Sequence, residues 1–385
     1  MKYAPTFNRL GVLDGLRGLA ILLVVWYHLR IVSGYALPGA GLADVFARNG
    51  YLGVDLFFFL SGFCICYPYA RARGEGRLRP SLSEFVRRRA RKIVPSYVLA
   101  LAVFAVVYHA RFASSGEEFV HLLAHLTFVH VWFPATFGSL SGPLWTLGVE
   151  VQFYVLFVCV SPFVDRYPLA AYACFVAVAV AYRGILAGCG LDTDFGWTNQ
   201  LPAVLDVFGA GMLAPYALLA LARRARLGVT LPACCACAAG LAIIGGFFAA
   251  DAAHIAAGDD GARRWLNEWR VTFGPLLLAV TLGVALGAPR LSSLAGGGAL
   301  AWLALVSYNA YLWNLEIAVG LQDAGLPPWA IFWLGAAATL AVSAFVTYRF
   351  ERPLQRIGFG RVLAAFRRAG TLPDFRRARR APTGS

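Results

Sequence analysis

The first apolar segment of the chain carries two ionisable side chains on one helical face. At about 100° per residue, the eleven positions from Arg17 to His28 make about three full turns, a separation of roughly 16 Å along the helix axis. Ionisable groups are expensive to keep in hydrocarbon, so in a membrane span they indicate a functional site. One elongated ligand could contact both residues, with His28 acting as a general base or a nucleophile. The alternative is a packed, hydrogen-bonded histidine without a chemical role.

A carboxylate in a later apolar segment is the candidate partner of His28. Glu150 falls in the outer half of its expected span, at a depth similar to that of His28. We expect Glu150 to orient the imidazole as the partner of a general base. Asp14 lies about 21 Å from His28 along the same helix, too far for this role, and is expected to pair with Arg17.

A cluster of five cations precedes the third apolar segment. Guanidinium groups bind phosphates through paired hydrogen bonds, so the cluster is a candidate anion site. It also fits the excess of basic residues that cytoplasmic loops carry. Together with Arg17 it suits the nucleotide phosphates of an acyl-coenzyme A, whose extended pantetheine arm would reach toward His28. The expected donor site consists of Arg17, Arg88, Arg89, Arg91, Lys92 and Tyr97.

The elements that must position these residues are membrane helices. Of the 385 residues, 59% are hydrophobic and 14% are charged, whereas a soluble protein carries about 25% charged residues. Apolar runs of about 20 residues recur, which predicts an all-α polytopic membrane protein with about ten transmembrane helices. The expected spans are residues 11–33, 50–70, 93–110, 140–162, 167–189, 200–222, 228–250, 269–288, 299–319 and 329–349.

The distribution of basic residues predicts the orientation of these helices. With the N-terminus inside, most of the 34 Lys and Arg residues fall on the cytoplasmic side, so both termini are expected there. Residues 1–353 form the expected membrane domain. The basic segment 354–385 is expected to be a cytoplasmic tail, either lying on the inner leaflet or anchoring the topology. The net charge of +14 is concentrated beside membrane spans, where it attracts anionic lipids, which argues against a nucleic-acid partner.

Other polar residues are weaker candidates. Asp55 and Ser61 are expected supporting groups in the second span, and Asp206 in the sixth has no partner that the sequence identifies. His121 and His125 have the i, i+4 spacing of zinc ligands, but no further ligand pattern accompanies them, so no metal is expected. All eight cysteines lie in or beside apolar spans, where cysteine packs as a small hydrophobe.

Six stretches of the chain match a known family. In order, they are Leu13–His28, Gly53–Phe63, Arg88–Tyr97, Gly142–Tyr154, Ser307–Trp313 and Tyr348–Pro353. Across nearly the whole chain they resemble the acyltransferase family 3 of integral membrane proteins, which O-acylate bacterial envelope polysaccharides and some small molecules. The resemblance implies a bacterial cytoplasmic (inner) membrane protein, an acetyl-CoA donor on the cytoplasmic side and an essential histidine at His28. It also implies roles for Arg17 and for an Arg-x-x-Arg element.

The chain departs from the family's pattern in two places. Alignment on residues 93–97 places the Arg-x-x-Arg element on Arg89 and Lys92, with lysine as its second member. Arg88 and Arg91 give the same spacing one residue earlier, so both registers stay open. Family members often have the motif Tyr-Leu-Trp-His. In this chain the last position of the motif is Asn314, so the role of the family's histidine is absent here or is taken by Asn314. We also expect the chain to act without the hydrolase-like domain that larger members carry.

The combined hypothesis is a membrane O-acyltransferase, most simply an O-acetyltransferase, that moves an acyl group from acyl-CoA to a hydroxyl of a cell-envelope glycan or its lipid-linked precursor. His28, oriented by Glu150, would take the hydroxyl proton or would carry the acyl group itself. Trp145, Gln152 and Tyr154 are the residues expected to meet the sugar. The alternatives are acylation of a small lipophilic acceptor such as a macrolide sugar, a proton-coupled secondary transporter with His28 as relay, and a scaffold without catalysis. The sequence does not indicate an oligomeric state.

Overall fold

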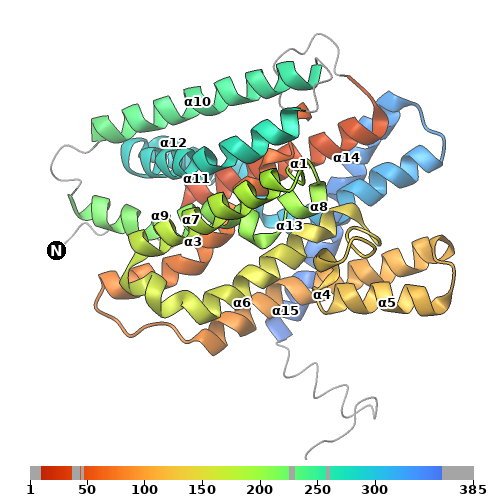
Figure 1. Ribbon diagram of the computed structural model, residues 1–385, viewed down its shortest axis with the longest axis horizontal. Coiled ribbons are helices and arrows are strands. Elements are labelled where there is room, and N and C mark those ends of the chain that lie inside the picture. The colour runs from red at the N-terminus through yellow and green to blue at the C-terminus, as the bar shows by residue number, and fades with distance from the viewer. Residues whose placement is uncertain (1–9, 37–43, 45–46, 225–229, 257–260, 358–385) are drawn as a thin grey trace, which may run out of the picture.

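The computed structural model describes residues 10–36, 44, 47–224, 230–256 and 261–357, and every regular element in these ranges is helical. Most of the long helices run roughly along the longest axis of the molecule (Figure 1). The predicted all-α fold is therefore confirmed. The predicted basic tail 354–385 falls mostly outside the described residues and stays a prediction.

The long helices follow the predicted spans closely. They are α1 (Gly11–Ser33), α3 (Leu52–Gly74), α4 (Leu82–Tyr108), α6 (Trp145–Arg166), α7 (Pro168–Gly188), α9 (Leu201–Arg224), α10 (Thr230–Ala256), α11 (Gly261–Gly287), α13 (Gly298–Asp323) and α14 (Pro328–Phe345). Shorter helices join them: η1 (His109–Arg111), α5 (Ser115–Leu126), η2 (His130–Trp132), η3 (Gly142–Leu144), α8 (Phe195–Thr198), α12 (Pro289–Ala295), η5 (Val346–Glu351) and α15 (Arg352–Ile357).

Eight helical segments of the described residues are long and apolar enough to cross a membrane, and they coincide with eight of the ten predicted spans. The other two predicted spans form α10 and α13, which do not meet this measure. Among its described residues α10 carries only a shorter apolar helix, Cys237–Phe247. In α13 the polar residues Asn309, Asn314 and Glu316 interrupt the apolar sequence. The chain is thus a polytopic membrane protein, and within its described residues eight of the ten predicted spans meet this measure.

Small residues set the distance between the central helices. A Cβ atom added to Gly18 of α1 would lie 2.5 Å from the carbonyl oxygen of Leu300 in α13, and one added to Gly211 of α9 would lie 2.0 Å from the carbonyl oxygen of Phe59 in α3. Membrane helices associate through such close backbone contact, because apolar side chains gain little by leaving lipid. The glycines therefore bring α1 against α13, and α3 against α9.

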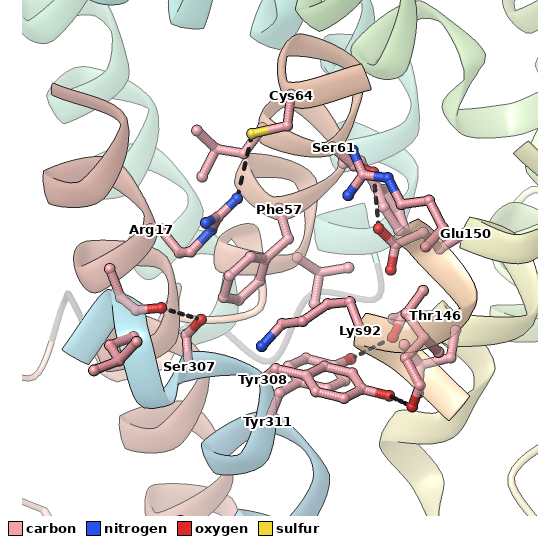
Figure 2. A pocket seen from close by; sticks show the side chains of 18 of the residues that line it. Arg17, Phe57, Ser61, Cys64, Lys92, Thr146, Glu150, Ser307, Tyr308 and Tyr311 are labelled. Carbon is pink, nitrogen blue, oxygen red and sulfur yellow. Dashed lines mark hydrogen bonds between the residues drawn. The ribbon is translucent and has the colours of Figure 1, made fainter. Parts of the chain in front are cut away.

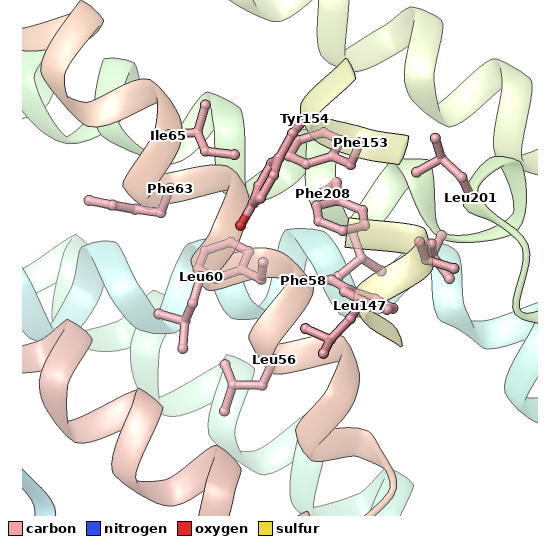
Figure 3. Close-up of a cluster of buried hydrophobic side chains, with 14 of the residues drawn as sticks. Leu56, Phe58, Leu60, Phe63, Ile65, Leu147, Phe153, Tyr154, Leu201 and Phe208 are labelled. Atoms are coloured by element: carbon pink, nitrogen blue, oxygen red, sulfur yellow. The ribbon is translucent and has the colours of Figure 1, made fainter. Parts of the chain in front are cut away.

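Aromatic side chains fill the space between α3, α6 and α9 (Figure 3). The ring of Phe208 stacks on Phe153 with centroids 3.9 Å apart and on Phe58 at 4.7 Å. Stacked rings at these distances add to the packing of the core. This cluster fixes α6 beside α3, and these two helices carry adjacent walls of the cavity described below.

The close contact of α3 and α9 predicts the effect of a single methyl group. We expect Gly211→Ala to destabilise the protein by about 1–3 kcal/mol, because the new Cβ atom must push two backbones apart. The change would appear as a lower midpoint of thermal unfolding for the purified protein.

Gly184→Ala in α7 is the matched control, since among the described residues no heavy atom lies within 4 Å of its added Cβ atom. Alanine favours a helix more than glycine does, so this variant should be at least as stable as the wild type. Equal thermal stability of the two variants would contradict the packing described here.

Candidate active site

A cavity of about 470 Å³ lies among α1, α3, α4, α6 and α13 (Figure 2). Charged, hydroxyl and aromatic side chains from all five helices line it. Those that bear on chemistry are Asp14, Arg17, Phe57, Ser61, Cys64, Arg89, Lys92, Thr146, Glu150, Tyr154, Ser307, Tyr308 and Tyr311.

Three cations from two helices converge on this cavity. Arg17 of α1 donates from Nη2 to Cys64 Sγ over 3.3 Å. Arg89 of α4 lies over the ring of Tyr154, 5.3 Å from its centroid. Lys92 Nζ lies 5.4 Å from the ring centroid of Tyr308. Guanidinium and ammonium groups that converge in this way can bind the phosphates of one anionic ligand.

The structure distinguishes the two registers of the Arg-x-x-Arg element. Arg89 and Lys92 line the cavity, whereas Arg88 and Arg91 are not among its lining residues. Arg88 is exposed and pairs with Glu84 one turn earlier, at 2.8 Å. The register with lysine as the second member is therefore the one that faces the cavity.

A buried carboxylate that the sequence analysis did not single out holds Lys92. Glu351 ends the π-helix η5, is 2% exposed, and forms an ion pair with Lys92. It also accepts hydrogen bonds from Asn309 Nδ2 at 2.8 Å and Gln355 Nε2 at 2.8 Å. A π-type turn inside a helix is often found at a functional site. The Tyr348–Pro353 stretch thus positions a cation of the cavity. The sequence offered one sign of this role, an acidic residue at the end of an apolar span.

Glu150 ties α6 to α3 across the cavity wall. It accepts from Ser61 Oγ at 2.7 Å and from Tyr154 OH at 2.5 Å. The structure therefore brings together Glu150, Ser61 and Tyr154, which were predicted to orient the base, to support the site and to meet the sugar. It does not join Glu150 to His28.

The partner of His28 is Asn314 of α13, which corrects the predicted orientation by Glu150. His28 Nδ1 lies 2.6 Å from Asn314 Oδ1. The amide nitrogen of Asn314 donates to the carbonyl oxygens of Ala310 and Tyr311, both at 2.9 Å, so its oxygen must face the histidine. An amide oxygen only accepts, so His28 carries its proton on Nδ1 and presents the lone pair of Nε2. A neutral imidazole held in this tautomer is ready to act as a base or nucleophile.

His28 lies beyond the end of the cavity opposite its cations. It is not a lining residue, but Asn314 follows the lining residue Tyr311 by three positions, about one helical turn. Tyr311 packs edge-on against Phe57 and donates to Pro143 O at 3.2 Å. Arg17 and His28 belong to one continuous helix, α1, so the predicted axial distance of about 16 Å between them stands.

Three predicted ligand-binding residues lie apart from this cavity. Tyr97 is buried and donates to the carbonyl oxygen of His125 at 3.1 Å. The Trp145 ring packs against Phe58 and two further phenylalanines. Gln152 lines a second cavity. Of the predicted sugar-binding set, only Tyr154 reaches the first cavity.

The intramembrane acids Asp55 and Asp206 have basic partners on neighbouring helices. Arg270 Nε lies 3.2 Å from Asp55 Oδ1, and Arg183 Nη2 lies 2.6 Å from Asp206 Oδ2. All four side chains are at most 9% exposed. Asp55 thus supports the bundle rather than the first cavity, and the partner of Asp206 is Arg183.

His125 of α5 and His130 of η2 form a stacked pair. The rings of His125 and His130 are 4.1 Å apart and nearly parallel. Burial, together with the neighbouring His130, lowers the pKa of His125 to about 3, which keeps this imidazole neutral. In the described part of the chain, no group of three or more His, Cys, Asp or Glu residues is arranged to hold a metal ion.

Comparison with known proteins identifies the family. A family model described as an acyltransferase domain matches residues 10–348. The chain belongs to this acyltransferase family. It is an acyltransferase, and the cavity with its three cations, together with His28 beyond it, is the candidate active site of this enzyme. No solved structure matches the acyltransferase.

Relatives of the acyltransferase include bacterial proteins named for exopolysaccharide production and for peptidoglycan O-acetylation. The exopolysaccharide production protein ExoZ of Rhizobium meliloti is 29% identical over 336 residues, which cover 82% of this chain and 93% of ExoZ. The peptidoglycan O-acetyltransferase OatA of Listeria monocytogenes is 30% identical over 167 residues, 40% of this chain and 24% of OatA. Protein 2 in the picA locus of Rhizobium radiobacter is 31% identical over 168 residues, 39% of this chain and 81% of that protein.

The Asn314 contact predicts the tautomer of His28. In protein labelled with ¹⁵N-histidine, we expect the His28 signal to show a protonated Nδ1 and an unprotonated Nε2. Asn314→Leu removes the acceptor and should abolish this preference. The His28 signal is assigned as the one that disappears in His28→Gln.

The exposed amide Gln322 on the same helix supplies the control, because Gln322→Leu leaves the contact intact. Two results would disprove the orientation of His28 derived from the hydrogen bonds. One is a wild-type His28 protonated on Nε2, and the other is a His28 tautomer that does not change in Asn314→Leu.

Proposed function

We propose that this acyltransferase takes an acetyl group from cytoplasmic acetyl-CoA and transfers it to a hydroxyl group of a cell-envelope glycan or its lipid-linked precursor. One observation carries the proposal: three cations line a cavity that extends to Tyr311, one helical turn before Asn314, and Asn314 bonds only Nδ1 of His28 and leaves Nε2 free of that contact. Acetyl-CoA matches this arrangement, because it joins a charged head to a long thin arm that ends in a reactive thioester.

The proposed orientation places the basic end of the bundle in the cytoplasm of a bacterium, within its inner membrane. Basic residues gather at the start of α1, in the segment that joins α3 to α4 and along the start of α4, and the positive-inside rule assigns these ends to the cytoplasmic side. Both chain termini are then cytoplasmic. Acetyl-CoA would enter from the compartment that contains it.

The donor fits the cavity by its charge distribution. The nucleotide phosphates would be bound by Arg17, Arg89 and Lys92, and Glu351 keeps Lys92 in place for this contact. The pantetheine arm would extend past Phe57 and Tyr311 toward His28. The aromatic rings offer it an apolar wall, and the hydroxyls of Ser307 and Thr146 offer hydrogen bonds to its amides.

In the proposed reaction His28 Nε2 takes the proton of the acceptor hydroxyl while its oxygen attacks the thioester carbonyl. The new C–O bond forms, the C–S bond breaks, and the coenzyme thiolate receives the proton back from the imidazolium. Asn314 Oδ1 holds Nδ1–H throughout and its dipole stabilises the transient positive charge. In a two-step variant Nε2 itself attacks the thioester carbonyl, forming a C–N bond as the C–S bond breaks and the coenzyme thiolate leaves. The acceptor hydroxyl then attacks this acyl group, the C–N bond breaks to restore Nε2, and the hydroxyl proton goes to the thiolate.

The register of the basic element gives the test of the donor site. Arg89→Met and Lys92→Met should each weaken acetyl-CoA binding by about 10- to 100-fold, because each removes a charge-assisted contact to phosphate. Isothermal titration of the protein in lipid nanodiscs measures the dissociation constant of acetyl-CoA.

Arg88→Met is the matched control, since it removes an equal charge from the exposed face of the same helix. Its dissociation constant should equal that of the wild type. If all three variants lost the same amount of affinity for acetyl-CoA, the cluster would act only through its overall charge. If the wild type did not bind acetyl-CoA, the proposed donor would be wrong.

The acceptor is tested by product analysis in proteoliposomes. Acetyl groups from labelled acetyl-CoA should appear as alkali-labile esters on lipid-linked envelope glycans. Transfer only to a small lipophilic sugar such as a macrolide would replace the proposed acceptor while leaving the donor chemistry intact.

A further inference from the structure

A second cavity, of about 720 Å³, lies beside α6, α7, α8 and the start of α9 and shares no lining residue with the first. Its walls are rich in aromatic rings. Trp132, Phe195 and Trp197 line it and are 56%, 47% and 45% exposed, so their faces are accessible at its mouth. Phe137 lines it further inside, against the ring of Phe195.

Polar side chains are interspersed among these rings. Asp194 and Gln200 line the cavity from the two ends of α8, and Gln152 lines it from α6. Within the described residues, Gln152 Nε2 is buried and has no hydrogen-bond partner. Leaving a buried donor unpaired costs free energy, so this amide is prepared for an acceptor atom that a ligand brings.

Buried ion pairs hold the walls of this cavity in place. Arg270, paired with Asp55, donates to the carbonyl oxygen of Thr198 at 3.0 Å, at the end of α8. Arg183, paired with Asp206, donates to the carbonyl oxygen of Ala203 at 2.7 Å, at the start of α9. Charges buried in an apolar bundle are costly, and these four fix the short helix that carries Phe195 and Trp197.

The Trp145 side chain contacts lining residues of both cavities. The Trp145 ring packs against Phe58, which lines the first cavity, with centroids 6.1 Å apart. On its other side it packs against Phe137 at 6.2 Å and Phe195 at 5.6 Å, which line the second. The next residue, Thr146, lines the first cavity. The rings of Phe58, Trp145 and Phe195 therefore stand in series between the two cavities.

We propose that the second cavity binds a sugar ring of the acceptor. A pyranose has apolar C–H faces and a rim of hydroxyl groups, so aromatic walls with a few amide and carboxylate groups match it. A ring oxygen or hydroxyl oxygen would accept from Gln152 Nε2, and hydroxyl groups would donate to Asp194. A lipid chain would leave Gln152 unpaired. This inference rests on the proposed function, because it names the place where the acceptor waits beside the donor cavity.

Saturation-transfer NMR on the full chain in lipid nanodiscs tests the site. The probes are the methyl β-glycosides of glucose and N-acetylglucosamine. Saturation transfer to at least one probe is expected with the wild type. Gln152→Leu and Trp197→Leu should each weaken binding of that probe by about tenfold, the loss of one hydrogen bond or one stacking contact.

Trp329→Leu removes an equally exposed tryptophan from α14 and should leave sugar binding unchanged. Absence of saturation transfer to both sugars, or equal binding by the two cavity variants and the wild type, would overturn the sugar site.

Acetyl-CoA binding, measured on the same samples, separates this inference from the proposed function. If every variant binds acetyl-CoA and only the sugar result fails, the second cavity is not the acceptor site and the donor proposal stands. If the wild type binds sugar but not acetyl-CoA, the proposed function falls while the sugar site remains.

Discussion

An ionisable side chain inside hydrocarbon needs a partner from another helix, because lipid cannot solvate it and the backbone of its own helix is already hydrogen-bonded. Arg270 of α11 meets Asp55 of α3, and Arg183 of α7 meets Asp206 of α9. Each pair joins two different helices, and both arginines also bond backbone carbonyls near α8. Breaking one partner of such a pair is costly, so these contacts allow few arrangements of the bundle.

The same requirement shapes the chemistry of the site. Lys92 is available to a phosphate because Glu351 positions it, and His28 presents Nε2 because Asn314 occupies Nδ1. The contact between His28 and Asn314 depends on the close approach of α1 to α13, which Gly18 permits. The helix that carries Asn314 is consequently too polar to count as an apolar span, although it packs between α1 and α14. The polar side chains of α13 serve the site but lower the hydropathy of the helix. Packing between α1 and α14 compensates for this low hydropathy.

The fold was largely predictable because hydropathy and length identify membrane helices, and these depend on local sequence alone. Several residues that the sequence predicts for the site lie together: Arg17, Arg89, Lys92, Glu150, Ser61 and Tyr154 line one cavity. The pairing of His28 with Glu150 was wrong because equal depth in a bilayer does not fix which helix lies alongside. Glu351, Arg270 and Arg183 were missed as partners for the same reason: their contacts join segments between 23 and 259 positions apart. The second cavity depends on the position of α8, which hydropathy does not predict.

The most direct test of the central claim compares wild type with His28→Gln in proteoliposomes, using labelled acetyl-CoA in a single turnover. A glutamine amide can still donate to Asn314, so the fold and the donor site should be retained. The account predicts an unchanged dissociation constant for acetyl-CoA and acetyl transfer slowed by at least about 10²-fold, because the base or nucleophile is gone. Acetyl transfer at the wild-type rate by His28→Gln would contradict it.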